Sequence, residues 1–189
     1  MADRTDNRRT DTRDRVLAVA LDLFAHQGYQ VTSLREIAER LGVTKAAVYF
    51  HFRTKQEILT ALLHGYAGDV SALAADAEAG QPLTRDGRAE LLRRYAVLQE
   101  QWGSGFVLLL RQNYAEIRDL PIGAAVQDGT ASLVRALAPA GAGPEDRLRV
   151  RVALTTFQIA ASTAATEDDP ATTEATIALA LDILHGGDH

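Results

Sequence analysis

The sequence contains no cysteine, one methionine and one tryptophan among 189 residues. Without cysteine, neither a disulfide nor a thiolate metal site can form, and an intracellular protein is the default expectation. No apolar run approaches the roughly 20 residues that cross a bilayer, and FVLLL at 106–110 is far too short. The first residues, MADRTDNRRTDTRDR, lack the apolar core of a signal peptide. We therefore expect a soluble, cytoplasmic protein that does not enter the membrane.

The composition is that of a globular protein, with 47% apolar and 24% charged residues. The net charge of −5 is unevenly distributed along the chain. Residues 1–55 hold ten Lys or Arg and seven Asp or Glu (+3), whereas residues 56–189 hold ten and eighteen (−8). A more basic N-terminal part can lie on phosphates while an acidic body stays clear of them. A chance fluctuation remains the alternative, since +3 over 55 residues is modest.

Helical periodicity predicts an all-α fold with about nine helices, because apolar residues recur three and four positions apart and no segment alternates like a strand. The first helix should end at Gly28, and a capping box at Ser33 and Glu36 should open the second. Gly65 and Gly68 predict a weak, kinked point within a long helix that begins near residue 55. Later helices are expected at 84–101, 104–118, 123–138, 145–165 and 171–185.

The segment REIAERLGVTKAAVYFHF, residues 35–52, contains three residues at a diagnostic spacing. Ala38 is small enough for two helices to approach closely, Gly42 tolerates the positive φ of a tight turn, and Val48 closes the contact between the helices. This is the spacing of a helix-turn-helix, whose second helix can enter a major groove. Any helical hairpin with a glycine turn is the alternative.

Residues 42–59, GVTKAAVYFHFRTKQEIL, and the preceding LFAHQGYQVTSLREIAERL resemble the DNA-binding region of the TetR family of bacterial one-component repressors. The resemblance covers roughly residues 13–63 and includes a helix–glycine–aromatic break and an aromatic-rich end to the recognition helix. It implies a three-helix DNA-binding domain at 1–54 and an effector-binding and dimerisation domain at 55–189. The second part resembles the family only in length and helical character.

Most of the expected DNA contacts lie at the starts of the two motif helices. Lys45 is the best candidate for a guanine contact, Tyr49 for a hydrogen bond to phosphate, and Lys55 for a phosphate anchor. The full expected set is Thr32, Ser33, Arg35, Thr44, Lys45, Ala46, Ala47, Tyr49, His51 and Lys55. For each polar member the alternative is a solvated surface side chain.

Three features beside the motif have expected places. Phe52 should pack inward against Phe24. Phe50 could face either way, and of the two we favour a partly buried ring that braces the end of the helix. The arginines within residues 4–9 would suit an arm along DNA, but the aspartates between them favour a disordered leader.

A recognition helix this short contacts few bases, so two copies are expected on a palindrome, about 34–36 Å apart or a multiple of that distance. The last two helices offer small residues and an aliphatic stripe for such a homodimer, and the family resemblance implies an isologous four-helix bundle there. Packing within one chain is the alternative. The residues concerned are Ala153, Ala160, Ala161, Ala164, Ala165, Ile177, Leu181 and Leu184.

The middle helices are expected to form an apolar cavity with a few fixed polar groups, which suits a small, mainly apolar effector. The expected lining is His64, Tyr66, Trp102, Phe106, Leu110, Asn113, Phe157 and Gln158; an ordinary core with satisfied amides is the alternative. A ligand that favours a shifted long helix, flexing at Gly65 and Gly68, would separate the recognition helices and release the DNA.

These patterns favour a ligand-responsive transcriptional regulator, a repressor by the family's commoner habit, that binds a double-stranded palindromic operator as a dimer. A helical enzyme is the first rival, but no catalytic residue, metal-ligand spacing or phosphate loop is evident, and we expect no cofactor. An architectural DNA-binding protein without an effector is the second rival, which loss of DNA binding on adding a ligand would exclude.

Overall fold

The computed structural model describes residues 3–80, 83–163 and 173–186, and every regular element within those ranges is a helix. The all-α fold with nine helices is therefore confirmed for the described part of the chain. In order, the helices are α1 (Asp3–Gln27), α2 (Leu34–Leu41), α3 (Lys45–His51), α4 (Lys55–Ala79), α5 (Arg85–Gln112), α6 (Tyr114–Asp119), α7 (Pro121–Leu137), α8 (Pro144–Thr163) and α9 (Thr173–His185).

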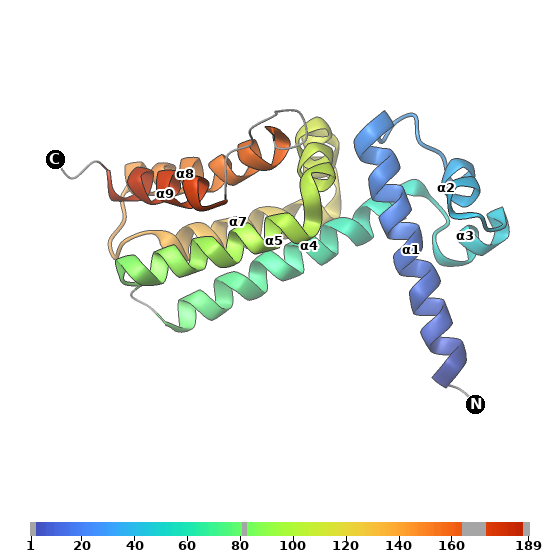
Figure 1. The fold of residues 1–189 in the computed structure, drawn as a ribbon, viewed down its shortest axis with the longest axis horizontal. Helices are drawn as coiled ribbons and strands as arrows, with labels where there is room; N and C mark the ends of the chain where they lie inside the picture. Colours follow the sequence, from blue (N-terminus) through green and yellow to red (C-terminus); the bar gives the residue numbers. More distant parts are fainter. Residues whose placement is uncertain (1–2, 81–82, 164–172, 187–189) are drawn as a thin grey trace.

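Helices α1, α2 and α3 gather at one end of the molecule, and α4 leads from them along the body (Figure 1). Within the body α4 packs mainly against α7, while α8 packs against α9 and α5. One continuous cluster of buried apolar residues extends from Val16 in α1 to Ala180 in α9. The boundary expected between residues 54 and 55 thus falls where α4 begins, and the core continues across it.

The ends of the first helices follow from local chemistry. α1 stops before Gly28, which has φ 99°, and α2 ends at Gly42, which has φ 70° and ψ 30°. The predicted capping box is present: the Ser33 hydroxyl accepts from the Glu36 amide, and the Glu36 carboxylate accepts from the Ser33 amide at 2.7 Å. These interactions fix both ends of α2, so its orientation is set by residues within four positions of each end.

The kink predicted in the long helix is wrong. α4 is helical from Lys55 to Ala79, and a Cβ placed on Gly65 would lie 2.8 Å from the Trp102 ring. Gly65 therefore makes room for a neighbouring aromatic side chain. The distortion lies instead in α5, at Gly103, with φ 76° and ψ 162°.

Two other boundaries differ from the prediction. The helix expected at 104–118 is interrupted at Asn113, which ends α5 at Gln112 and separates it from α6. The disordered leader is also wrong, because α1 begins at Asp3. Extending a helix whose packed turns have already formed costs little per residue, so a polar leader continues it.

By length and composition α4 could cross a membrane, and half of its most apolar window is buried in the fold. Its buried side chains include Ile58, Leu62, Tyr66 and Val70. The core helix of a soluble protein meets the same criteria, so this one helix is weak evidence for a membrane span.

Candidate DNA-binding face and ligand cavity

The contact between α2 and α3 has the geometry that the sequence spacing predicts. Ala38 is buried, Val48 has no exposed surface, and the Val43 amide donates to the Ala38 carbonyl at 3.1 Å across the turn. Gly42 occupies the left-handed region. α3 is thereby held rigidly on α2, with its other face turned outward.

The outward face of α3 carries Lys45, Ala46, Tyr49 and Phe50. The Lys45 ammonium lies 5.1 Å from the centroid of the Tyr49 ring, a cation–π contact that holds both side chains near each other. The Thr44 hydroxyl accepts from the Ala47 amide at 3.3 Å and caps the helix. A cation, a phenol and a small apolar residue therefore project together from the first turns of a short helix.

The Phe50 side chain is 66% exposed, so the partly buried ring that we expected is not found. Val48 is the only buried residue of α3, and a side chain two positions later points to the other side of a helix. The half-buried His51 ring meets Phe50 edge-on at 5.1 Å. Phe52 is buried in the same cluster as Phe24.

Two side chains near the start of α2 that we expected to contact DNA have hydrogen-bond partners within the chain. Thr32 is 2% exposed, and its hydroxyl donates to the Gly28 carbonyl at 2.8 Å and accepts from the Gln27 amide at 3.1 Å. Arg35 is exposed, and its hydrogen bond to Glu39, at 2.7 Å, raises the pKa of its guanidinium. Surface pairs of this kind are worth little, so Arg35 remains able to exchange Glu39 for a phosphate.

Lys55 occupies a different place from the phosphate anchor that we predicted. Its ammonium donates to the carbonyl oxygens of Tyr29, Gln30 and Thr32, at 2.7, 2.6 and 3.2 Å, and lies 4.6 Å from the Tyr29 ring centroid. Three carbonyls account for all three of its donor hydrogens. In this structure Lys55 ties the start of α4 to the loop that precedes α2.

A cavity of about 540 Å³ lies among α4, α5, α6, α7 and α8, within the usual size range of small-molecule sites. Of the predicted lining residues, Tyr66, Leu110 and Gln158 border it. Its wall also includes the aliphatic side chains of Ile117, Val126 and Ala131. It also includes three arginines that the sequence did not single out, Arg111, Arg118 and Arg151.

The other predicted lining residues lie elsewhere. Phe157 borders a smaller cavity of about 270 Å³, and Trp102 and Phe106 pack behind Tyr66. Asn113 is buried and donates to the Leu109 carbonyl at 3.0 Å, so its amide helps end α5. His64 is exposed in a separate hollow beside His51 and Arg13.

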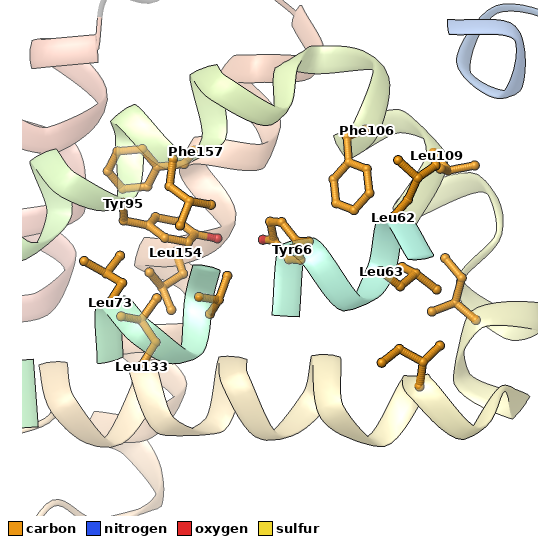
Figure 2. Packing of buried hydrophobic residues seen from close by; sticks show 14 of the residues in the cluster. Leu62, Leu63, Tyr66, Leu73, Tyr95, Phe106, Leu109, Leu133, Leu154 and Phe157 are labelled. Atoms are coloured by element: carbon orange, nitrogen blue, oxygen red, sulfur yellow. The ribbon is translucent and has the colours of Figure 1, made fainter. Parts of the chain in front are cut away.

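A polar cluster crosses the apolar core beside the main cavity. The Gln99 amide donates to the Tyr66 hydroxyl at 3.0 Å. Burial raises the pKa of Tyr95 well above its usual value, and hydrogen bonding to Tyr66 adds to this effect, while a hydrogen bond with Gln158 opposes it. Figure 2 shows the hydroxyl groups of Tyr66 and Tyr95 facing each other. Tyr95 and Gln99 lie one helical turn apart on α5, but their sequence does not reveal the partners on α4 and α8.

An aromatic group connects the cavity with the N-terminal helices. The Tyr66 ring lies 4.9 Å from Phe106 and 5.8 Å from Trp102, and the latter two are 4.6 Å apart. Next to Phe106, a Cβ on Gly105 would lie 3.0 Å from the Ala25 Cβ of α1. The part of α5 beyond Gly103 is therefore wedged between the cavity wall and α1.

The expected dimer face is partly used within the chain, and its members Ala160, Ala161, Leu181 and Leu184 are half-buried. Ala153 and Ile177 are buried within a single chain, because they hold α8 and α9 to the body. Ala164 and Ala165 lie outside the described residues. The exposed apolar side chains of these helices are instead Leu148, Val152 and Ile159 on α8 and Leu179 on α9, each 46–59% exposed.

The region that contains the helix-turn-helix is similar to known bacterial proteins. Residues 16–62 match the model of the bacterial regulatory proteins of the tetR family. The chain is 37% identical over 87 residues to the HTH-type transcriptional regulator AcrR of Shigella flexneri, an alignment that covers 44% of this chain and 40% of AcrR. It is 43% identical over 63 residues to SrpR of Pseudomonas putida, covering 33% and 30%. The chain thus spans less than half the length of these curated relatives.

The fold comparison extends over nearly the whole chain. A TetR-family transcriptional regulator from Bordetella parapertussis superposes with a TM-score of 0.71 at 17% identity, covering 93% of this chain and 95% of that one. At such identity the likeness concerns the fold alone. The helical body behind the helix-turn-helix is therefore arranged as in that regulator.

Proposed function

Because this chain belongs to the TetR family of bacterial regulatory proteins, we propose that it is a ligand-responsive transcriptional repressor that binds a palindromic operator as a homodimer. The observation that carries the proposal is the exposed face of α3, with Lys45, Ala46 and Tyr49 projecting from a rigid helix-turn-helix. Its curated relatives are named as transcriptional regulators, which are not enzymes.

The proposed DNA contacts follow from the chemistry of that face. Lys45 donates to guanine O6 and N7, and Ala46 touches a thymine methyl group. Tyr49 donates its hydroxyl to a phosphate, and the exposed Phe50 ring adds an apolar contact at the groove wall. The positive N-terminal end of α2 and the Arg35 guanidinium take further phosphates.

Dimerisation sets the spacing of the two recognition helices. Leu148, Val152 and Ile159 are separated by four and seven residues, which places them on one face of α8, and Leu179 is exposed on α9, which packs against α8. Two copies of this face bury each other in a four-helix bundle with two-fold symmetry. The recognition helices then lie about 34–36 Å apart, or a multiple of that distance, on a palindrome.

Effector binding acts through the contacts between the cavity and α1. A ligand beside Tyr66 displaces the aromatic group that includes Phe106, and the neighbouring Gly105 lies against Ala25 of α1. Gly103, with its left-handed backbone, is the point at which α5 bends. A ligand that binds the displaced arrangement more tightly than the DNA-bound one releases the operator, with a coupling of typically 1–3 kcal/mol.

The test is a nuclease footprint of the protein on the DNA upstream of its own gene, repeated with a panel of amphipathic metabolites. We expect a protected palindrome and loss of protection with one compound class. Protection that no compound removes would identify an architectural DNA-binding protein. Absence of any protected sequence there and in a genome-wide selection would contradict the proposal.

A further inference from the structure

Three of the ten arginines of the body line one cavity. Residues 56–189 hold ten arginines and eighteen acidic residues. Of these, three arginines but one carboxylate, Asp128, line the cavity among α4–α8. Arg118 pairs with the adjacent Asp119 at 3.1 Å, but arginines still outnumber carboxylates in the lining, and the exposed positions of Arg111, Arg118 and Arg151 place their charge at the solvent side.

Arg151 is the best placed of the three for a ligand. It precedes Gln158 by seven residues on α8, so both side chains face the same cavity. Among the residues that the structure describes, its guanidinium has no hydrogen bond or ion pair. Its neighbours on α8 are engaged: Arg147 donates to the Ala142 carbonyl at 2.8 Å, and Arg149 pairs with Glu145 at 2.9 Å.

The inner part of the cavity has the opposite character. Leu110, Ile117, Val126 and Ala131 supply aliphatic walls, and the Tyr66 hydroxyl at the buried end already accepts a hydrogen bond from Gln99. No charged side chain accompanies Tyr66 at that end in the part of the chain that the structure describes. The cavity is apolar inside and cationic at its opening.

We propose that the effector is an amphipathic anion, with an aliphatic body against the inner walls and a carboxylate or phosphate head group at Arg151. Guanidinium groups bind both head groups through paired charge-assisted hydrogen bonds. The inference rests on the proposed ligand-responsive function and narrows its effector, which we had expected to be mainly apolar. A cationic amphiphile would be repelled by the guanidinium charge at Arg151, and a neutral one would accept only a weaker hydrogen bond from it than a carboxylate or phosphate does.

The single tryptophan supplies a direct binding assay without DNA. Trp102 lies 5.8 Å from the Tyr66 ring, which borders the cavity, so a ligand there changes its fluorescence. The probes are decanoate, decyl phosphate, 1-decanol and decyltrimethylammonium, with carboxylates of about eight to fourteen carbons to cover the cavity size. The variants are Arg151→Gln and, as a matched control one turn away on the same helix, Arg147→Gln.

We expect at least one anion to bind about tenfold or more tightly than 1-decanol, and decyltrimethylammonium to bind no better than the alcohol. Arg151→Gln should remove about tenfold of the anion's affinity and leave that of 1-decanol unchanged, while Arg147→Gln changes neither. Equal affinity for the charged and neutral probes, no binding by any anion of the series, or an Arg151→Gln variant that still prefers anions would overturn the inference. Because the assay contains no DNA, these results are independent of the footprint that tests the repressor proposal.

Discussion

Replacing Gly42 with alanine tests whether the turn of the helix-turn-helix depends on its left-handed backbone. Gly42 has φ 70° and ψ 30°, and a Cβ placed on it would meet no atom within 4 Å. The whole cost of Gly42→Ala is therefore a backbone cost, without any steric clash.

A non-glycine residue in the left-handed region costs about 1–2 kcal/mol. Alanine also restricts the unfolded chain, which returns about 0.4–1 kcal/mol. We therefore expect Gly42→Ala to lower the free energy of unfolding by about 1 kcal/mol. For a chain of this size, this corresponds to a fall in Tm of about 2–4 °C.

Gly68→Ala is the matched control, since Gly68 is exposed within α4 and its Cβ would also meet no atom within 4 Å. There the backbone is helical, so alanine should raise the stability by about 0.5–1 kcal/mol. Thermal unfolding followed by circular dichroism, at one fixed protein concentration, measures both changes.

The same chemical substitution should thus have opposite signs at two open positions. If Gly42→Ala were as stable as the wild type, or followed Gly68→Ala upward, the left-handed turn would not be what holds α3 on α2. The geometry of the DNA-binding face would then need another explanation.

Three further results are expected. Lys55→Met removes three charge-assisted hydrogen bonds to carbonyls and should lower the free energy of unfolding by about 1.5–3 kcal/mol. Unchanged stability, together with a decrease of about one in the slope of log affinity for DNA against log salt concentration, would show a phosphate contact instead. Tyr66→Phe leaves the buried Gln99 amide without its acceptor and should lower the free energy of unfolding, measured by chemical denaturation, by about 1–3 kcal/mol. If Tyr66→Phe lowered the stability equally in a chain that already carries Gln99→Leu, the two side chains would not be paired. Burial raises the pKa of Tyr95, so the unfolded chain loses this proton first: its contribution to stability is intact below about pH 10 and declines as the pH rises toward the folded pKa. Melts between about pH 9 and 11 should therefore show a shallower decline for Tyr95→Phe than for the wild type, and parallel curves would contradict the assignment.

The features that the sequence predicted well depend on short-range chemistry. The capping box of α2, the glycine at its end and the buried Ala38 and Val48 involve residues at most ten positions apart. These residues lie close together in the sequence, so their spacing can be recognised without knowledge of the fold. The helix-turn-helix was therefore predictable in detail.

The errors arose where tertiary contacts decide. A glycine in a helix weakens it locally, but Gly65 lies in an uninterrupted α4, where Trp102 occupies the space beside it. The phosphate contact of Lys55 stays a prediction, but the carbonyls that accept from its ammonium lie 23–26 residues earlier in the chain and were not foreseen. Neither partner can be recognised from local periodicity.

The cavity was the hardest feature to predict. Five helices form this cavity, so its lining residues come from segments that lie far apart in the sequence. Arg151 looks like any exposed arginine of α8 until the fold places it beside Gln158 and Leu110. Its sequence neighbours Arg147 and Arg149 are also arginines, but their guanidinium groups have partners within the chain.

The central claim is that α3 presents Lys45 and Tyr49 to the DNA duplex, and the affinity of a Lys45→Met/Tyr49→Phe double variant for the footprinted operator tests it most directly. Arg135→Met, a charge removal on the exposed surface of α7, is the control. With the helical content and Tm of both variants matching the wild type, we expect fluorescence anisotropy to show at least a tenfold loss for the double variant, since a base contact is worth about 1–3 kcal/mol, and no loss for the control. Wild-type affinity in the folded double variant would contradict the claim.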